Sequence, residues 1–258
     1  MIDRLRLEQI CHEAGQMAMQ RWPGAGHVLE SWDKLDTSPV SEADLAVDRY
    51  LKRELGLLLP SAGWLSEETA DTPSRLDKSL IWVVDPIDGT RDFIRGRTGW
   101  AVSVALVSAG RPLIGIMVAP ARGEVWSATA GQGAWRNGER LVASTRAEFH
   151  GARVPAEGLM PEDQVLTPVD RPNSIALRIA MVGANEADIV ATLRWGYEWD
   201  IAAATLIARE AGAATTDAFG KALAYNKRDP RAFGLLVTAP AIHPAAVTHL
   251  AERAAALC

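Results

Sequence analysis

Cysteine is scarce in this sequence of 258 residues, which contains only Cys11 and Cys258. The first falls in a predicted helix and the second is the last residue, so we expect no disulfide framework and a reducing compartment, the cytoplasm. Hydrophobic residues make up 48% of the chain, so a core of ordinary size can form without covalent cross-links.

Long apolar runs and an excess of positive charge are missing too. No stretch reaches the roughly 18 consecutive apolar residues of a membrane-spanning helix, and the charged start of the chain does not resemble a signal peptide. The net charge of −5 lacks the basic excess of a typical nucleic-acid surface. We therefore expect neither a membrane nor a nucleic-acid polymer as a partner, whereas a small anion can still bind where cations or metal ions gather.

The hydrophobic pattern predicts a layered arrangement of helices and a mixed or antiparallel sheet. Predicted helices cover residues 3–21, 41–58, 174–183, 200–212 and 243–257. Predicted strands cover residues 80–84, 100–107, 113–118, 124–129 and 235–239, and turn residues between the middle three suggest an antiparallel meander. Residues 33–40 are expected to form a loop or hairpin, while four prolines leave residues 144–172 without a clear element.

Carboxylates are the groups most able to carry chemistry here, because the five histidines are scattered and match no zinc-binding spacing. Asp85 and Asp88 follow a continuous apolar run, as at the end of a buried strand. Pro86 restricts the backbone between them, and Gly89 permits a sharp bend before a turn or helix at Thr90. Free backbone N–H groups beside two carboxylates suit a phosphate together with Mg²⁺.

Each acidic motif also has a plainer interpretation. Asp85 and Asp88 could belong to a simple turn with a helix cap, and Glu67-Glu68 could be solvated surface. Asp200 could be the N-cap of the alanine-rich helix that it precedes, and Asp44 could complete a capping box with Ser41. Capping does not exclude a role in a metal site.

Three motifs in order resemble the inositol monophosphatase superfamily of Mg²⁺-dependent phosphatases: Glu67-Glu68, Asp85-Pro86-Ile87-Asp88-Gly89-Thr90 and Trp199-Asp200. The resemblance covers nearly the whole chain and is weakest over residues 144–172. It implies an α+β fold, the layered αβαβα sandwich shared with fructose-1,6-bisphosphatases, and commonly a homodimer. It also implies one phosphatase domain over residues 1–258, with an N-terminal lobe to about residue 140 and a C-terminal lobe that contributes Asp200.

Roles of individual residues also follow from the resemblance. It implies two or three Mg²⁺ ions, a small phosphate ester as substrate, sensitivity to Li⁺, and a set of metal ligands made of Glu67, Asp85, the carbonyl of Ile87, Asp88 and Asp200. No covalent phospho-enzyme is needed, because the metal ions activate a water molecule and neutralise the departing alkoxide.

The remaining roles concern the phosphate and the attacking water. The resemblance implies that the backbone N–H groups of Gly89 and Thr90 hold the phosphate and that Asp200 also contacts the substrate. Asp44 matches the acid that pairs with Thr90. Glu67 and the Thr90–Asp44 pair would position the water and accept its proton.

Flanking residues favour the 3′(2′),5′-bisphosphate nucleotidase branch, with adenosine 3′,5′-bisphosphate as the expected substrate. Segments 34–41, 65–68, 198–200 and 225–228 are similar to that branch, although histidinol phosphatases share much of the first. Inositol phosphatases place a glutamate seven residues before the aspartate of Trp-Asp, where this chain has Leu193 followed by Arg194. A cation there suits a second phosphate better than a polyol, unless Arg194 is solvated surface.

Two other interpretations stay open at this stage. The enzyme could act on inositol 1-phosphate or histidinol phosphate, which the metal motifs do not distinguish. It could also be a non-catalytic interaction scaffold that retains the fold, although the presence of all the expected acids argues against that.

Overall fold

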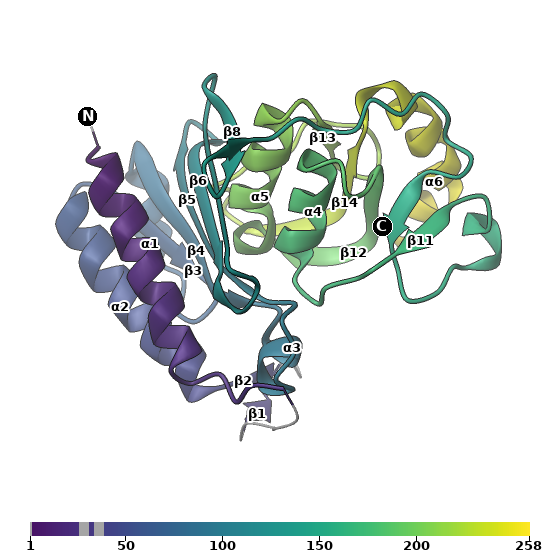
Figure 1. Ribbon diagram of the computed structural model, residues 1–258. Coiled ribbons are helices and arrows are strands. Elements are labelled where there is room, and N and C mark those ends of the chain that lie inside the picture. Colours follow the sequence, from purple (N-terminus) through teal and green to yellow (C-terminus); the bar gives the residue numbers. More distant parts are fainter. Residues whose placement is uncertain (1, 26–30, 34–38) are drawn as a thin grey trace.

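The computed structural model describes residues 2–25, 31–33 and 39–258 (Figure 1). Its elements form five layers in the order helices, sheet, helices, sheet and helix. The predicted αβαβα sandwich is therefore confirmed. Whether the chain divides into lobes near residue 140 stays a prediction.

The larger sheet has seven strands in the spatial order of the chain. β3 and β4 are parallel, and every later neighbour is antiparallel, so the predicted meander is confirmed. The strands are β3 (Gly63–Ser66), β4 (Leu80–Asp88), β5 (Ala101–Ser108), β6 (Arg111–Ala119), β7 (Glu124–Thr129), β8 (Gly133–Arg136) and β9 (Glu139–Arg140).

Two amphipathic helices, α1 (Arg4–Met19) and α2 (Glu42–Leu58), cover the outer face of this sheet (Figure 1). Their apolar sides pack on β4, β5 and β6 and bury a continuous hydrophobic cluster. The predicted capping box is present at the start of α2, where Ser41 is the N-cap and Asp44 accepts from its backbone N–H.

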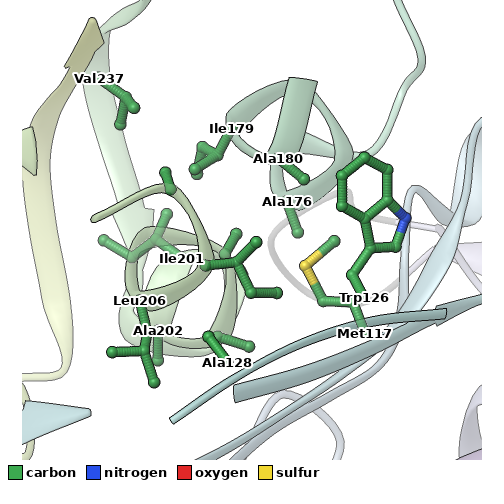
Figure 2. Packing of buried hydrophobic residues seen from close by; sticks show 14 of the residues in the cluster. Met117, Trp126, Ala128, Ala176, Ile179, Ala180, Ile201, Ala202, Leu206 and Val237 are labelled. Atoms are coloured by element: carbon green, nitrogen blue, oxygen red, sulfur yellow. The ribbon is translucent and has the colours of Figure 1, made fainter. Parts of the chain in front are cut away.

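The opposite face of the sheet carries α4 (Ile175–Gly183) and α5 (Glu198–Glu210), which lie between the two sheets (Figure 2). Both helices are apolar around most of their circumference because they are covered on both sides. The alanines of α5 allow close packing on β6, where a Cβ at Gly115 would lie 2.8 Å from the carbonyl oxygen of Ala203.

The second sheet has three antiparallel strands and is covered by the C-terminal helix α6 (His243–Leu257). Its order is β12 (Ile189–Tyr197), β14 (Arg231–Thr238) and β13 (Ala214–Thr216). Sequence analysis predicted β14 and α6 but missed β12, whose Arg194 and Trp195 interrupt the apolar pattern and lie at an irregularity in the strand pairing.

Short elements complete the chain. α3 (Thr90–Ile94) begins where a helix or turn was predicted, and β1 (Trp32–Asp33) pairs with β2 (Pro39–Val40). Within residues 144–172, β10 (Arg153–Pro155) pairs in parallel with β11 (Thr167–Val169). Residues 34–38 belong to the segment 34–41 that resembles the nucleotidase branch, and they lie outside the described residues. No helix of the described chain combines the length and apolar character needed to cross a membrane.

Candidate active site

The acidic motifs meet at one edge of the larger sheet because β3 and β4 are parallel. Ser66 is paired with Val84, so Glu67, just past the end of β3, follows beside Asp85, which still lies within β4. The backbone N–H of Glu67 donates to the carbonyl oxygen of Val84 at 3.3 Å. The sheet register therefore sets two acidic side chains beside each other.

A third carboxylate comes from the helix layer. Carboxylate oxygens of Glu67, Asp85 and Asp200 all lie within 4.8 Å of one another. α5 begins at Glu198, so Asp200 lies in the first turn of the helix and is not its N-cap, as one interpretation of the sequence had it. Instead, the backbone N–H of the true N-cap, Tyr197, donates to Asp200 Oδ2 at 2.9 Å. This contact fixes one oxygen of Asp200 and leaves the other for a ligand.

The remaining acid of the central motif, Asp88, is held by the start of α4. Its carboxylate accepts from the Ser174 hydroxyl at 2.5 Å and from the backbone N–H groups of Ala176 at 2.7 Å and Ile175 at 3.3 Å. Asp88 lines the same cavity as the other acids but is outside the close carboxylate group. Its role as a metal ligand stays a prediction.

The predicted partnership between Thr90 and Asp44 is present. Thr90 Oγ1 lies 3.3 Å from Asp44 Oδ1 and 3.0 Å from the carbonyl oxygen of Ile87. A hydroxyl has one proton, so it donates to one of these acceptors at a time. The buried Asp44 also accepts from the backbone N–H and hydroxyl of Ser41, which hold its carboxylate in place.

Gly89 connects β4 to α3 in a conformation that other residues rarely adopt. Its φ is +94°, and a Cβ there would lie 2.6 Å from the carbonyl oxygen of Gly99. Both reasons require glycine at this position. The tight approach lets Gly89 and Thr90 line the cavity directly beside the acids.

The concentration of buried carboxylates in this cluster suits a bound cation. Burial, followed by repulsion from neighbouring carboxylates, raises the pKa of Asp85 and of Asp200 well above the usual value. Burial raises the pKa of Asp44 to about 6, with a contribution from Glu67. The donors are all oxygens, which suits a hard divalent ion better than a soft metal, so the residues present fit a Mg²⁺-type site.

The acids line a cavity of about 240 Å³ that arginines line as well. Arg171, Arg178 and Arg194 are among them. Sequence analysis noticed Arg194 but missed the other two, since Arg178 lies inside the apolar run of α4 and Arg171 in the unassigned stretch 144–172, and neither belongs to a motif. The lining consists of Glu67, Asp85, Ile87, Asp88, Gly89, Thr90, Arg91, Arg171, Asn173, Ile175, Arg178, Arg194 and Asp200.

Residues 225–228, which resemble the nucleotidase branch, affect the site only through α5. They do not line this cavity. The backbone N–H groups of Asn226 and Lys227 donate to the buried carboxylate of Glu198 at 2.5 and 3.1 Å. The segment therefore fixes the first turn of α5, and with it Asp200.

Comparison with known proteins agrees with this geometry. The model of the inositol monophosphatase family matches residues 5–255. The chain belongs to this family. It is a phosphomonoesterase with an acidic cluster that can hold a metal ion. The resemblance inferred from the three motifs is confirmed.

Named relatives in the inositol monophosphatase family differ in substrate. The chain is 31% identical to the 3′(2′),5′-bisphosphate nucleotidase CysQ of Escherichia coli O157:H7 over 239 residues, covering 86% of this chain and 95% of that protein. It is 33% identical to a histidinol-phosphatase of Mycobacterium tuberculosis over 205 residues, covering 73% and 78%. A Thermotoga maritima IMPase structure superposes with a TM-score of 0.85 at 27% identity and covers 100% of both chains.

Proposed function

We propose that this phosphatase uses Mg²⁺ to hydrolyse the 3′-phosphate of a 3′,5′-bisphosphate nucleotide such as adenosine 3′,5′-bisphosphate. The proposal has two parts, the metal-assisted hydrolysis and the choice of substrate. The first rests on the carboxylate cluster and the second on the three arginines that face it.

Glu67, Asp85 and Asp200 would hold the metal, joined by Asp88 and the carbonyl of Ile87. The chemistry that Mg²⁺ supplies when bound is a lowered pKa for the attacking water and positive charge beside the leaving oxygen. Two or three ions would fit the family's pattern. The buried acids support this assignment, because burial, followed by mutual repulsion, raises their pKa values, and a bound cation would favour their charged forms.

The residues around the metal would orient the water and accept its proton. Thr90 Oγ1 is within hydrogen-bonding reach of Asp44, so a proton taken from water by the hydroxyl oxygen can be balanced by donation to that carboxylate. Glu67 would orient the same water. The backbone N–H groups of Gly89 and Thr90 would hold the phosphate, and charge on it would face the arginines.

The three arginines carry the substrate assignment. Arg178 is only 8% exposed, and burial followed by repulsion from Arg171 lowers its pKa to about 10. Its Nε and Nη2 donate to the backbone carbonyls of Ser174 and Asn173, which points the guanidinium in a fixed direction. A second phosphate on the substrate would relieve this concentration of positive charge, whereas a neutral polyol would not.

A substrate panel tests the assignment. With Mg²⁺, we expect kcat/KM for adenosine 3′,5′-bisphosphate to exceed the values for inositol 1-phosphate and histidinol phosphate. If the nucleotide is the poorest of the three substrates, the assignment is wrong. If no phosphate ester is hydrolysed, the scaffold interpretation replaces it.

An arginine variant tests the second phosphate directly. Arg194→Gln removes an exposed cation from the cavity wall, so kcat/KM for the bisphosphate should fall by roughly tenfold or more. The value for inositol 1-phosphate should change little. Arg209→Gln, an equally exposed change on the far end of α5, is the matched control. Homodimer formation and inhibition by Li⁺ stay predictions of the family resemblance.

A further inference from the structure

A second and larger cavity adjoins the acidic one. It has a volume of about 540 Å³ and lies between β12, α6 and the segment that follows β10. Arg171, Arg178 and Arg194 line both cavities. The three guanidinium groups therefore mark the boundary between the metal site and this second space.

The walls of the second cavity combine aliphatic side chains with charged ones. Ile189, Ala191 and Leu193 alternate along β12 and share the face that packs toward α6. Leu166 and Leu250 line it from the other side. Hydroxyl groups of a polyol that pack on these aliphatic side chains would be left unsatisfied, at a cost of about 1–3 kcal/mol for each buried group.

A compact group of polar side chains lines the same cavity. Asp163 accepts two hydrogen bonds from Arg253, at 3.0 and 2.7 Å, and one from His249 Nε2 at 2.8 Å. The three side chains are each about one-fifth to one-quarter exposed, so they are partly open to the cavity. Aliphatic side chains beside donors and acceptors held in place suit an organic group that has apolar faces and a polar edge.

We propose that this second cavity binds the heteroaromatic base of the substrate, with the base against Ala191 and Leu193 and its polar edge toward His249 and Asp163. This inference rests on the proposed function, since it names where the organic part of the bisphosphate nucleotide lies. The 3′-phosphate then occupies the acidic cavity, the second phosphate meets the arginines, and the base enters the space beyond them.

Two substrates that differ only in the base test the inference on the unaltered enzyme. These are 2′-deoxyadenosine 3′,5′-bisphosphate and an abasic 2′-deoxyribose 3′,5′-bisphosphate, both with saturating Mg²⁺. We expect the abasic compound to have a KM at least about tenfold higher, because it loses the apolar contacts of the base. Equal KM values would overturn the base site while leaving the phosphatase assignment intact. If neither compound is hydrolysed, the proposed function and the base site both fall.

A cavity-filling variant locates the effect. Ala191→Phe adds a ring to the wall of the second cavity, so the KM for the 2′-deoxyadenosine compound should rise to that of the abasic one. Circular dichroism and the thermal melting temperature report whether the variant keeps the wild-type fold. Ala255→Phe makes the same change on the exposed side of α6 and is the matched control. If Ala191→Phe leaves the preference for the base unchanged, the base does not bind there.

Discussion

Thr90 Oγ1 lies between two acceptors, 3.3 Å from Asp44 Oδ1 and 3.0 Å from the carbonyl oxygen of Ile87. The shorter contact is to a carbonyl that is itself an expected metal ligand. A cation at that carbonyl would compete for its lone pairs, so the Thr90 proton would turn toward Asp44. Metal binding and the orientation of the proton acceptor are therefore coupled through one side chain.

This arrangement predicts a catalytic defect in Thr90→Val, which keeps the shape of the side chain and removes its hydroxyl. We expect kcat to fall by about 10²-fold or more, with a smaller change in KM, because proton transfer is impaired more than binding. Steady-state kinetics with saturating Mg²⁺ measures both. Thr90→Ser, which restores the hydroxyl, should recover most of the activity; an equally inactive serine variant would point to packing instead.

Metal removal should destabilise the wild-type protein through its own carboxylates. At 100 times the dissociation constant, Mg²⁺ should add about 2.7 kcal/mol to the free energy of unfolding, because it binds the folded state alone. Asp85→Asn removes one buried charge, so this variant should melt at a higher temperature than the wild type in EDTA and gain less from Mg²⁺.

Thermal melts with and without MgCl₂ make this comparison. Glu139→Gln, an exposed acid on β9, serves as the control and should respond to Mg²⁺ as the wild type does. An unchanged Mg²⁺ response in Asp85→Asn would remove Asp85 from the set of metal ligands.

A carboxylate remote from the metal motifs, Asp188, should contribute to the fall in the free energy of unfolding at low pH. Asp188 is 1% exposed, and although burial acts to raise its pKa, hydrogen bonds from Arg153 and Ser144 lower it to about 2. The usual value of 3.8 applies to the unfolded chain, so the contribution is complete above about pH 4 and is lost as pH falls toward 2. It amounts to about 2 kcal/mol.

Urea unfolding at several pH values measures that contribution. Asp188→Asn should lower the free energy of unfolding at pH 7 and flatten its decline between pH 4 and 2. The exposed Asp170→Asn makes the same chemical change and should leave both unaltered. If the free energy of unfolding of Asp188→Asn declines between pH 4 and 2 as steeply as that of the wild type, Asp188 is not the group responsible.

Asp48 should control metal affinity without contacting the metal. Its carboxylate accepts from Ser66 Oγ at 2.5 Å and Thr69 Oγ1 at 2.6 Å, on either side of Glu67. Asp48→Ala should raise the Mg²⁺ concentration for half-maximal activity by about 10- to 100-fold, because the loop that carries Glu67 loses its anchor. Asp48→Asn keeps an acceptor and should show a smaller shift. Equal Mg²⁺ dependence in all three proteins would limit Asp48 to a purely structural role.

Two glycine substitutions of the same kind should have opposite effects. Gly89→Ala places a Cβ at φ +94° and 2.6 Å from a carbonyl oxygen, so both stability and activity should fall. Gly56 lies on the exposed side of α2, where an added Cβ meets no atom within 4 Å, so Gly56→Ala should stabilise the protein by roughly 0.5–1 kcal/mol. Chemical unfolding and kcat/KM measure the contrast. Full activity in Gly89→Ala would show that the turn can relax.

The features that could be read from sequence are those with a local physical cause. Ser41 and Asp44 are three residues apart and cap their helix as predicted. The meander of β5 to β7 follows from short turns between apolar strands. Strand β12 was missed because its second half carries Arg194 and Trp195 on a half-exposed surface, which weakens the apolar pattern.

The start of the helix that carries Asp200 could also not be predicted from the local sequence. Sequence analysis placed its start two residues late because tertiary contacts, above all those of Asn226 and Lys227 with Glu198, extend it toward Tyr197. Those contacts join residues far apart along the chain. No local propensity predicts them.

The sequence by itself determined that a buried strand begins at Leu80, that the chain bends at Gly89 and that a helix or turn begins at Thr90, together with the chemical identity of the acids there; the predicted strand of residues 80–84 extends to Asp88 in the structure. Backbone preferences of Pro86 and Gly89 and the buried apolar run before Asp85 are enough for that. Only the tertiary structure decided which carboxylates approach one another and that Arg171, Arg178 and Arg194 face them. These side chains come from separate layers of the fold, so their approach depends on how the helices pack against the sheets. The hydrophobic pattern of the sequence does not specify that packing.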